Sequence, residues 1–149
     1  MHTNPQTEHG KFEHLADGAQ LMLTSIRQWI ASYHLEECGC CALRPQYKAY
    51  DIEGALPVLN EMMCFLSLAV VKELVIFSPV DEDVSEDEAA ILRMIKAVEA
   101  NQPHSAYEHA GGYFPPPVAT TFFRICRCMV DHYSNGGLVF AGSTKLRLV

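Results

Sequence analysis

The chain has 149 residues, a length typical of one domain, and hydrophobic residues make up 49% of it, which excludes a disordered protein. The 11 Lys and Arg residues against 18 Asp and Glu residues give a net charge of −7, and the basic residues form no run. Because an acidic protein repels phosphate backbones, the composition argues against a nucleic-acid partner.

The most apolar stretch, residues 62–71, is too short to cross a bilayer, which takes about 20 residues. The first twenty residues show no apolar segment after a basic start, so we expect no signal peptide. We therefore predict a cytoplasmic protein without a membrane partner. In that compartment its six cysteines are reduced and are core residues, metal ligands or reactive thiols.

The first half of the chain predicts a tail and two helices. Residues 1–11 lack any apolar period and are expected to be a flexible N-terminal tail, which leaves 12–149 as a single helical domain. Apolar residues at spacings of three and four predict a helix over 12–34. Residues 35–53 are predicted to be a long connection. The next helix, 54–77, is apolar on all sides through Val71, as expected of a central helix or one at an oligomer interface.

The second half predicts two more helices. Ser85 and Glu88 form a capping-box pair that begins a helix ending near residue 100. The six carboxylates of 81–88 are expected to be a solvated acidic corner, since acids favour a helix N-terminus. Prolines and glycines in 101–116 predict a second irregular connection. A helix follows over 117–134, and 138–149 has a strand-like alternation near its end.

Four helices of this length predict an all-α fold: a four-helix up-down bundle with a short irregular or β-like C-terminal arm. A two-lobed helical array is the alternative. In the bundle, both long connections lie at the same end of the molecule. This topology decides which polar side chains are expected to meet.

The bundle brings three cysteines and two histidines to one end: Cys38, Cys40, Cys41, His104 and His109. Thiolates and imidazoles are the ligands that Zn²⁺ prefers, so a zinc or iron site is one hypothesis. Thiol redox chemistry is another, because a thiol near histidine is readily deprotonated. No motif such as Cys-x-x-Cys at a helix N-terminus supports it.

The loop at 104–114 carries four residues that could line a pocket for a small ligand: Tyr107, His109, Tyr113 and Phe114. The same side chains could equally pack over the open end of the bundle.

No phosphate loop, dinucleotide fingerprint or nucleophile elbow is present, and no catalytic residue is predicted. The sequence therefore favours a non-enzymatic binding or regulatory module that acts as a homo-oligomer, in the simplest case a homodimer, with a protein partner or a small ligand. The alternative is a metal-binding or thiol-redox protein that uses the Cys/His cluster, with zinc as its cofactor in the metal-binding case.

Overall fold

The computed structural model describes residues 10–141, and this part of the chain is helical with no β-strand. Its elements are a short 3-10 helix (Phe12–His14) and six α-helices: α1 (Asp17–His34), α2 (Gly39–Ala49), α3 (Ala55–Ala69), α4 (Glu86–Glu99), α5 (Pro103–Ala110) and α6 (Pro116–Asn135). The predicted all-α class is confirmed. The four-helix bundle is not confirmed, because six helices are present.

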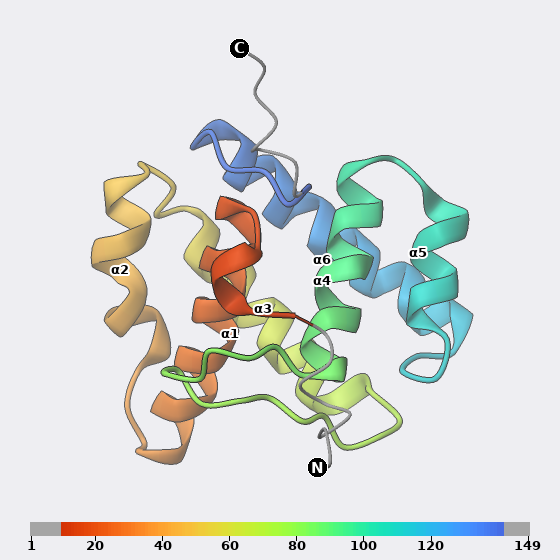
Figure 1. Cartoon of the computed structure of the whole chain (residues 1–149), viewed down its shortest axis with the longest axis horizontal. Helices are drawn as coiled ribbons and strands as arrows, with labels where there is room; N and C mark the ends of the chain where they lie inside the picture. Colours follow the sequence, from red (N-terminus) through yellow and green to blue (C-terminus); the bar gives the residue numbers. More distant parts are fainter. Residues whose placement is uncertain (1–9, 142–149) are drawn as a thin grey trace.

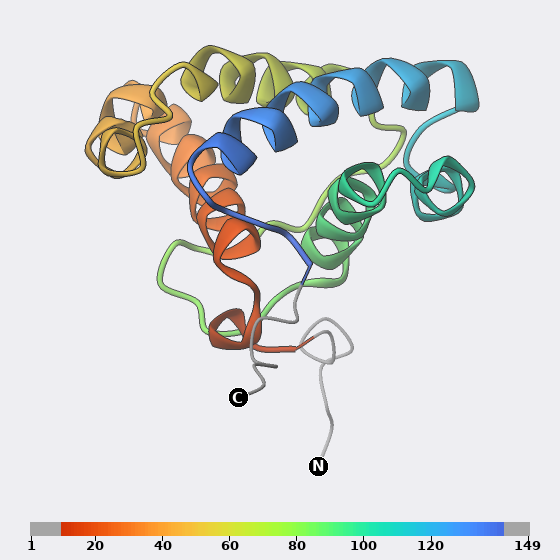
Figure 2. The same ribbon diagram turned by 90° about the horizontal axis from the view of Figure 1, so that it is seen from above.

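The helices form two groups of three (Figure 1). In the first group α2 packs on α1 and α3, and in the second α5 packs on α4 and α6. The two groups meet mainly where α3 lies beside α6, while α1 and α4 converge on the opposite side (Figure 2). An extended segment, residues 70–85, links the groups; we call it the strap.

Both predicted connections contain a helix. In the first, Leu43 and Tyr47 bury their side chains one turn apart in α2. Pro45 lies inside α2 and removes one backbone hydrogen bond, a loss that this burial offsets. In the second, Pro103 occupies the start of α5 and Gly111 its C-cap. These residues, expected to exclude regular structure over 101–116, delimit a helix instead.

The predicted helix over 54–77 is too long, because α3 ends at Ala69 and Val70 is extended. The strap that follows is held by side chains of α4 and its cap. Asp87 accepts the Val75 N–H at 2.7 Å, and Ser85 donates its hydroxyl to the Val75 carbonyl at 2.6 Å. These partners satisfy backbone groups that would otherwise need a helix.

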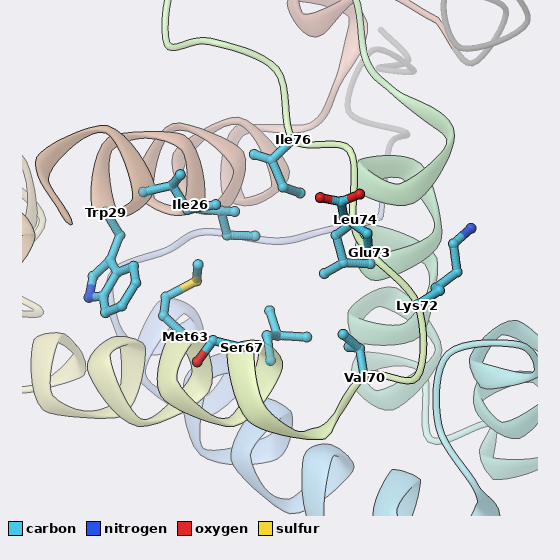
Figure 3. Close-up of a pocket in the computed structure, with 11 residues that line it drawn as sticks. Ile26, Trp29, Met63, Ser67, Val70, Lys72, Glu73, Leu74 and Ile76 are labelled. Carbon is cyan, nitrogen blue, oxygen red and sulfur yellow. The ribbon is translucent and has the colours of Figure 1, made fainter. Parts of the chain in front are cut away.

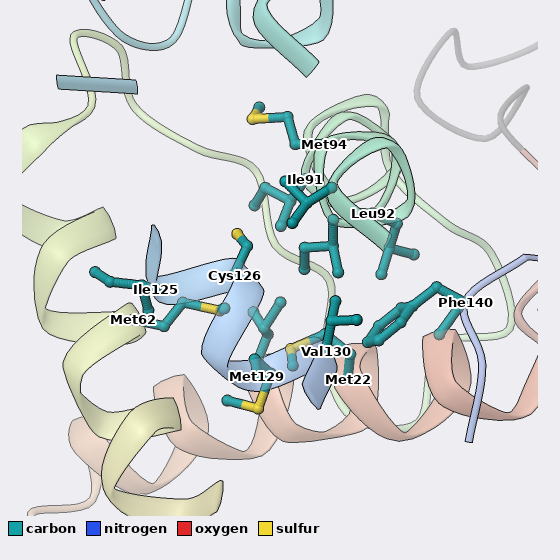
Figure 4. Close-up of a cluster of buried hydrophobic side chains, with 14 of the residues drawn as sticks. Met22, Met62, Ile91, Leu92, Met94, Ile125, Cys126, Met129, Val130 and Phe140 are labelled. Atoms are coloured by element: carbon teal, nitrogen blue, oxygen red, sulfur yellow. The ribbon is translucent and has the colours of Figure 1, made fainter. Parts of the chain in front are cut away.

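The core lies between the two groups and is rich in methionine and aliphatic side chains (Figure 4). The residues labelled there include Met22 from α1, Met62 from α3, Ile91 from α4 and Met129 from α6. Helices α4 and α6 match the helices predicted over 85–100 and 117–134 closely. In the part of the chain that the structure describes, no helix is long and apolar enough to span a membrane.

A buried ion pair joins the two groups. The guanidinium of Arg27 on α1 donates to both carboxylate oxygens of Glu88 on α4, each at 2.8 Å. It also donates to the carbonyls of Asp81 and Asp83 in the strap. Glu88 accepts two further N–H groups, from Phe77 and from Ser85. Since all these charges are compensated, the pair is tolerated at 2% and 0% exposure.

The predicted solvated acidic corner is therefore only partly solvated. Asp87 and Glu88 are buried, and Asp87 also accepts from the Tyr113 hydroxyl at 2.6 Å and from Lys72 at 3.2 Å. Ser85 and Glu88 form the predicted capping box. The acids that hold the strap are the same residues that begin α4.

Both ends of the described chain are held by contacts with other parts of the fold. Gly10 and Lys11 fall within the predicted tail, yet Lys11 pairs with Asp83 in a short β-bridge and ion pair. At the other end, residues 138–141 cross between α1 and α4 (Figure 2), and Glu99 accepts the N–H groups of Phe140 and Ala141. The rest of the predicted tail and the predicted strand-like pattern at 145–148 lie outside the described residues.

We expect Glu88→Gln to lower the free energy of unfolding by about 3–5 kcal/mol, because it leaves the buried Arg27 charge without its counter-charge. Chemical denaturation followed by circular dichroism measures this change. Glu86→Gln, an exposed change in the same helical turn, should stay within about 0.5 kcal/mol. Equal effects of the two substitutions would show that the pair does not stabilise the fold.

Candidate functional site

Two thiols share the first turn of α2. Cys38 is the N-cap residue, and its sulfur accepts the backbone N–H of Cys41 at 3.2 Å. Both side chains are exposed and both are reduced. The sequence from Cys38 to Cys41 is therefore a Cys-x-x-Cys motif at a helix N-terminus, where the helix dipole favours a thiolate.

Close packing places this turn against α1. A Cβ atom at Gly39 would lie 2.9 Å from the Cα of Trp29, so a larger residue would push α2 away. Farther along α2, the buried Tyr47 hydroxyl lies 2.7 Å from that of Ser25 on α1 and 2.7 Å from that of Tyr133 on α6. Ser25 donates to the Leu21 carbonyl, so the chain of donors runs from Tyr133 through Tyr47 to Ser25. These contacts fix the helix that carries the thiols.

The thiols differ in their electrostatics. Hydrogen bonds from the Cys41 thiol and the Cys41 N–H stabilise the thiolate of Cys38 and hold its pKa below the ordinary value. The same side-chain hydrogen bond raises the pKa of Cys41. Burial raises the pKa of Cys40, whose sulfur contacts the Leu56 carbonyl at 3.6 Å. Of these two exposed thiols, Cys38 is therefore the one that loses its proton more readily.

The structure does not bring the predicted histidines to the cysteines. His104 and His109 lie on α5, which is on the opposite side of the molecule from α2 in both views (Figures 1 and 2). His104 is exposed near Glu108, and His109 lines a shallow depression beside α4. Within residues 10–141, no group of three or more His, Cys, Asp or Glu side chains is placed to hold a metal ion.

The predicted pocket loop packs largely into the fold. Tyr113 is buried and donates to Asp87, and Phe114 is buried against Phe65 and Phe122. Tyr107 remains partly exposed, with its ring edge on Phe123 and its hydroxyl on Thr120. Tyr113 and Phe114 therefore cover the core, whereas Tyr107 and His109 keep part of their surface in solvent.

A groove of about 310 Å³ lies between α1, α3 and the strap, and Trp29, which packs against Gly39 of α2, stands at one end of it (Figure 3). Its walls are mostly apolar, and two charged side chains, Lys72 and Glu73, stand at its strap side. Its lining includes Trp29 from α1, Met63 from α3 and Leu74 from the strap. The sequence did not predict this groove because the first part of the strap, residues 70–77, was predicted to be helical.

The dithiol motif had a signal in the sequence. Cys38 and Cys41 are three residues apart, and Leu43 and Tyr47 continue an apolar spacing that predicts a helix after them. Two residues argue against a helix here: Gly39, which lies between the cysteines, and Pro45. The sequence predicted these cysteines to lie in a connection, whereas they lie at the start of α2.

No protein-family model, curated protein or solved structure matches the chain. The arrangement of the side chains is thus the basis for a functional proposal.

We expect the rate of Cys38 alkylation by iodoacetamide to rise with pH around a midpoint below that of an unperturbed cysteine thiol. The lowered pKa of Cys38 increases its thiolate fraction at neutral pH, and the thiolate is the reactive form. Cys41→Ala removes a stabilising hydrogen bond, so the midpoint should move to higher pH. Mass spectrometry of the labelled peptides measures both, and Cys40→Ser serves as the control. An unchanged midpoint in Cys41→Ala would contradict this assignment.

Proposed function

We propose that the protein carries out thiol–disulfide exchange through Cys38 and Cys41. The observation that carries the proposal is the pair of exposed thiols at the N-cap and third residue of α2, linked by a hydrogen bond to the Cys38 sulfur. This retains the thiol-redox alternative of the sequence analysis without its histidines.

The proposed exchange proceeds in two steps. The Cys38 thiolate attacks one sulfur of a substrate disulfide, the substrate S–S bond breaks, and the leaving thiolate takes up a proton. Cys41 then loses its proton and attacks the Cys38 sulfur, which releases the second substrate thiol. The protein dithiol is oxidised by two electrons, and the substrate disulfide is reduced to two thiols. A dithiol reductant regenerates the protein by the reverse steps.

The position of the pair favours a labile disulfide. Cys38 is the extended N-cap residue and Cys41 lies in the first turn of α2, so a bond between these two exposed side chains would close at an exposed helix end. Exposed disulfides are among the readily reduced ones. In the cytoplasm, the compartment that we propose, such a pair is reduced until an oxidant arrives.

Equilibration in glutathione redox buffers should convert Cys38 and Cys41 reversibly to a disulfide, with the loss of two hydrogen atoms. We expect a midpoint between about −270 and −120 mV, the range of Cys-x-x-Cys enzymes. Acid quenching followed by mass spectrometry and peptide mapping measures the fraction oxidised.

The controls are single serine substitutions. Cys40→Ser should retain the disulfide, while Cys38→Ser and Cys41→Ser should lose it. If the wild-type chain forms only glutathione adducts, or if the disulfide forms equally well without Cys38, the proposal is wrong.

A second function, the binding module predicted from the sequence, is favoured by the exposed apolar side chains on the first helical group. Leu35 and Tyr33 are 68% and 67% exposed at the end of α1, and Leu68 is 87% exposed on α3. Exposed large apolar side chains are the groups that a protein interface buries. Here the candidate partner is a second copy of the chain.

Light scattering coupled to size exclusion tests this second function. We expect a dimer that Leu68→Glu converts to a monomer, because a buried charge without a partner disfavours the interface. Val80→Glu, an equally exposed change in the strap, is the matched control. A wild-type chain that stays monomeric at high concentration would contradict the homo-oligomer.

A further inference from the structure

Trp29 connects the dithiol to the groove. Its backbone lies against Gly39, the residue that follows Cys38, and its side chain lines the groove. The indole N–H donates to the side-chain oxygen of Asn60 at 3.2 Å, and the ring stacks on Tyr33 at 5.7 Å between centroids. A molecule that fills the groove as far as Trp29 therefore lies beside the first turn of α2.

The groove suits an apolar side chain of a polypeptide. Its volume of about 310 Å³ is at the small end of ligand sites, and most of its lining is aliphatic or aromatic (Figure 3). Three separate parts of the chain, α1, α3 and the strap, contribute to this lining.

The charges around this surface are mainly acidic. Glu36 and Glu37 directly precede Cys38, Glu61 follows Asn60 on α3, and Glu73 lines the groove; all four are exposed. The nearby cations are already engaged: Lys72 pairs with Asp87, and Arg44 lies 3.8 Å from Glu53. This field attracts a basic partner and repels an anionic one.

We infer that the substrate of the dithiol is a cysteine-containing polypeptide segment, with an apolar side chain in the groove and basic residues facing these glutamates. The inference rests on the proposed thiol–disulfide exchange and names its substrate class. Oxidised glutathione, in which carboxylates outnumber ammonium groups, is disfavoured by the same charges. The polypeptide places its sulfur next to Cys38, which then attacks it as described above.

Activated disulfides provide the test. The probes are a short peptide with one cysteine flanked by leucines and lysines, the same peptide with glutamates for lysines, and glutathione, each carried as its pyridyl disulfide. Attack by Cys38 releases pyridinethione, whose absorbance gives the rate, and Cys41→Ser traps the mixed disulfide for mapping. Dithiodipyridine, which is small and uncharged, measures the intrinsic reactivity of Cys38.

Relative to dithiodipyridine, we expect the leucine–lysine peptide to react about tenfold faster than glutathione, and the glutamate peptide to fall between them. Ser67→Phe, which fills the groove from α3, should remove the part of this preference that comes from the apolar side chain and leave only the smaller part that comes from charge. Ser134→Phe, an exposed change on α6, is the matched control and should retain the preference.

Two results would overturn the inference alone: equal relative rates for all three probes, or a preference that Ser67→Phe leaves undiminished. A change of oligomeric state in Ser67→Phe, seen by light scattering, would also overturn it, because a second copy would then occupy the groove. If dithiodipyridine reacts no faster at Cys38 than at the exposed Cys64, the proposed exchange chemistry itself fails.

Discussion

The buried pair of Arg27 and Glu88 is the interaction on which the rest of the structure depends. Each partner uses its remaining hydrogen-bonding capacity on the strap, so the pair joins the two helical groups and fixes the extended segment between them. The cost of desolvating both charges offsets much of the attraction between them. The main effect of the pair is therefore to select one arrangement of the two helical groups. Because the strap forms the third wall of the groove, the shape of the groove follows from this pair.

The sequence predicted the elements whose limits are set locally. Ser85 and Glu88 cap α4 with their own side chains, and proline near the start of α6 marks its beginning. The end of α3 was missed because its cause is distant in sequence: Val75 bonds to Asp87 and Ser85 across a turn of chain. The β-branched residues of the strap were the available hint, since they favour extended backbone. Helix α2 was missed because Pro45 argues against a helix unless the burial of Leu43 and Tyr47 is known.

The sequence predicted the cysteines of the candidate site but not the residues around them. The cysteines stood out by their composition alone, but their expected neighbours followed from a bundle topology that placed both connections at one end. With six helices in two groups, α5 lies on the far side, and His104 and His109 go with it. The aromatic residues of the same loop, Tyr113 and Phe114, illustrate the other difficulty. A pocket lining and a core covering have the same sequence pattern, and only the packing partner distinguishes them.

Trp29 is the only tryptophan of the chain, and it stands between the dithiol and the groove. Indole emission responds to the polarity of its surroundings and is quenched by nearby sulfur. The tryptophan emission of this protein therefore originates at a single residue, which packs against the start of α2 and lines the groove. The native chain carries its own optical reporter, so that events at α2 and in the groove can be followed in real time without a label.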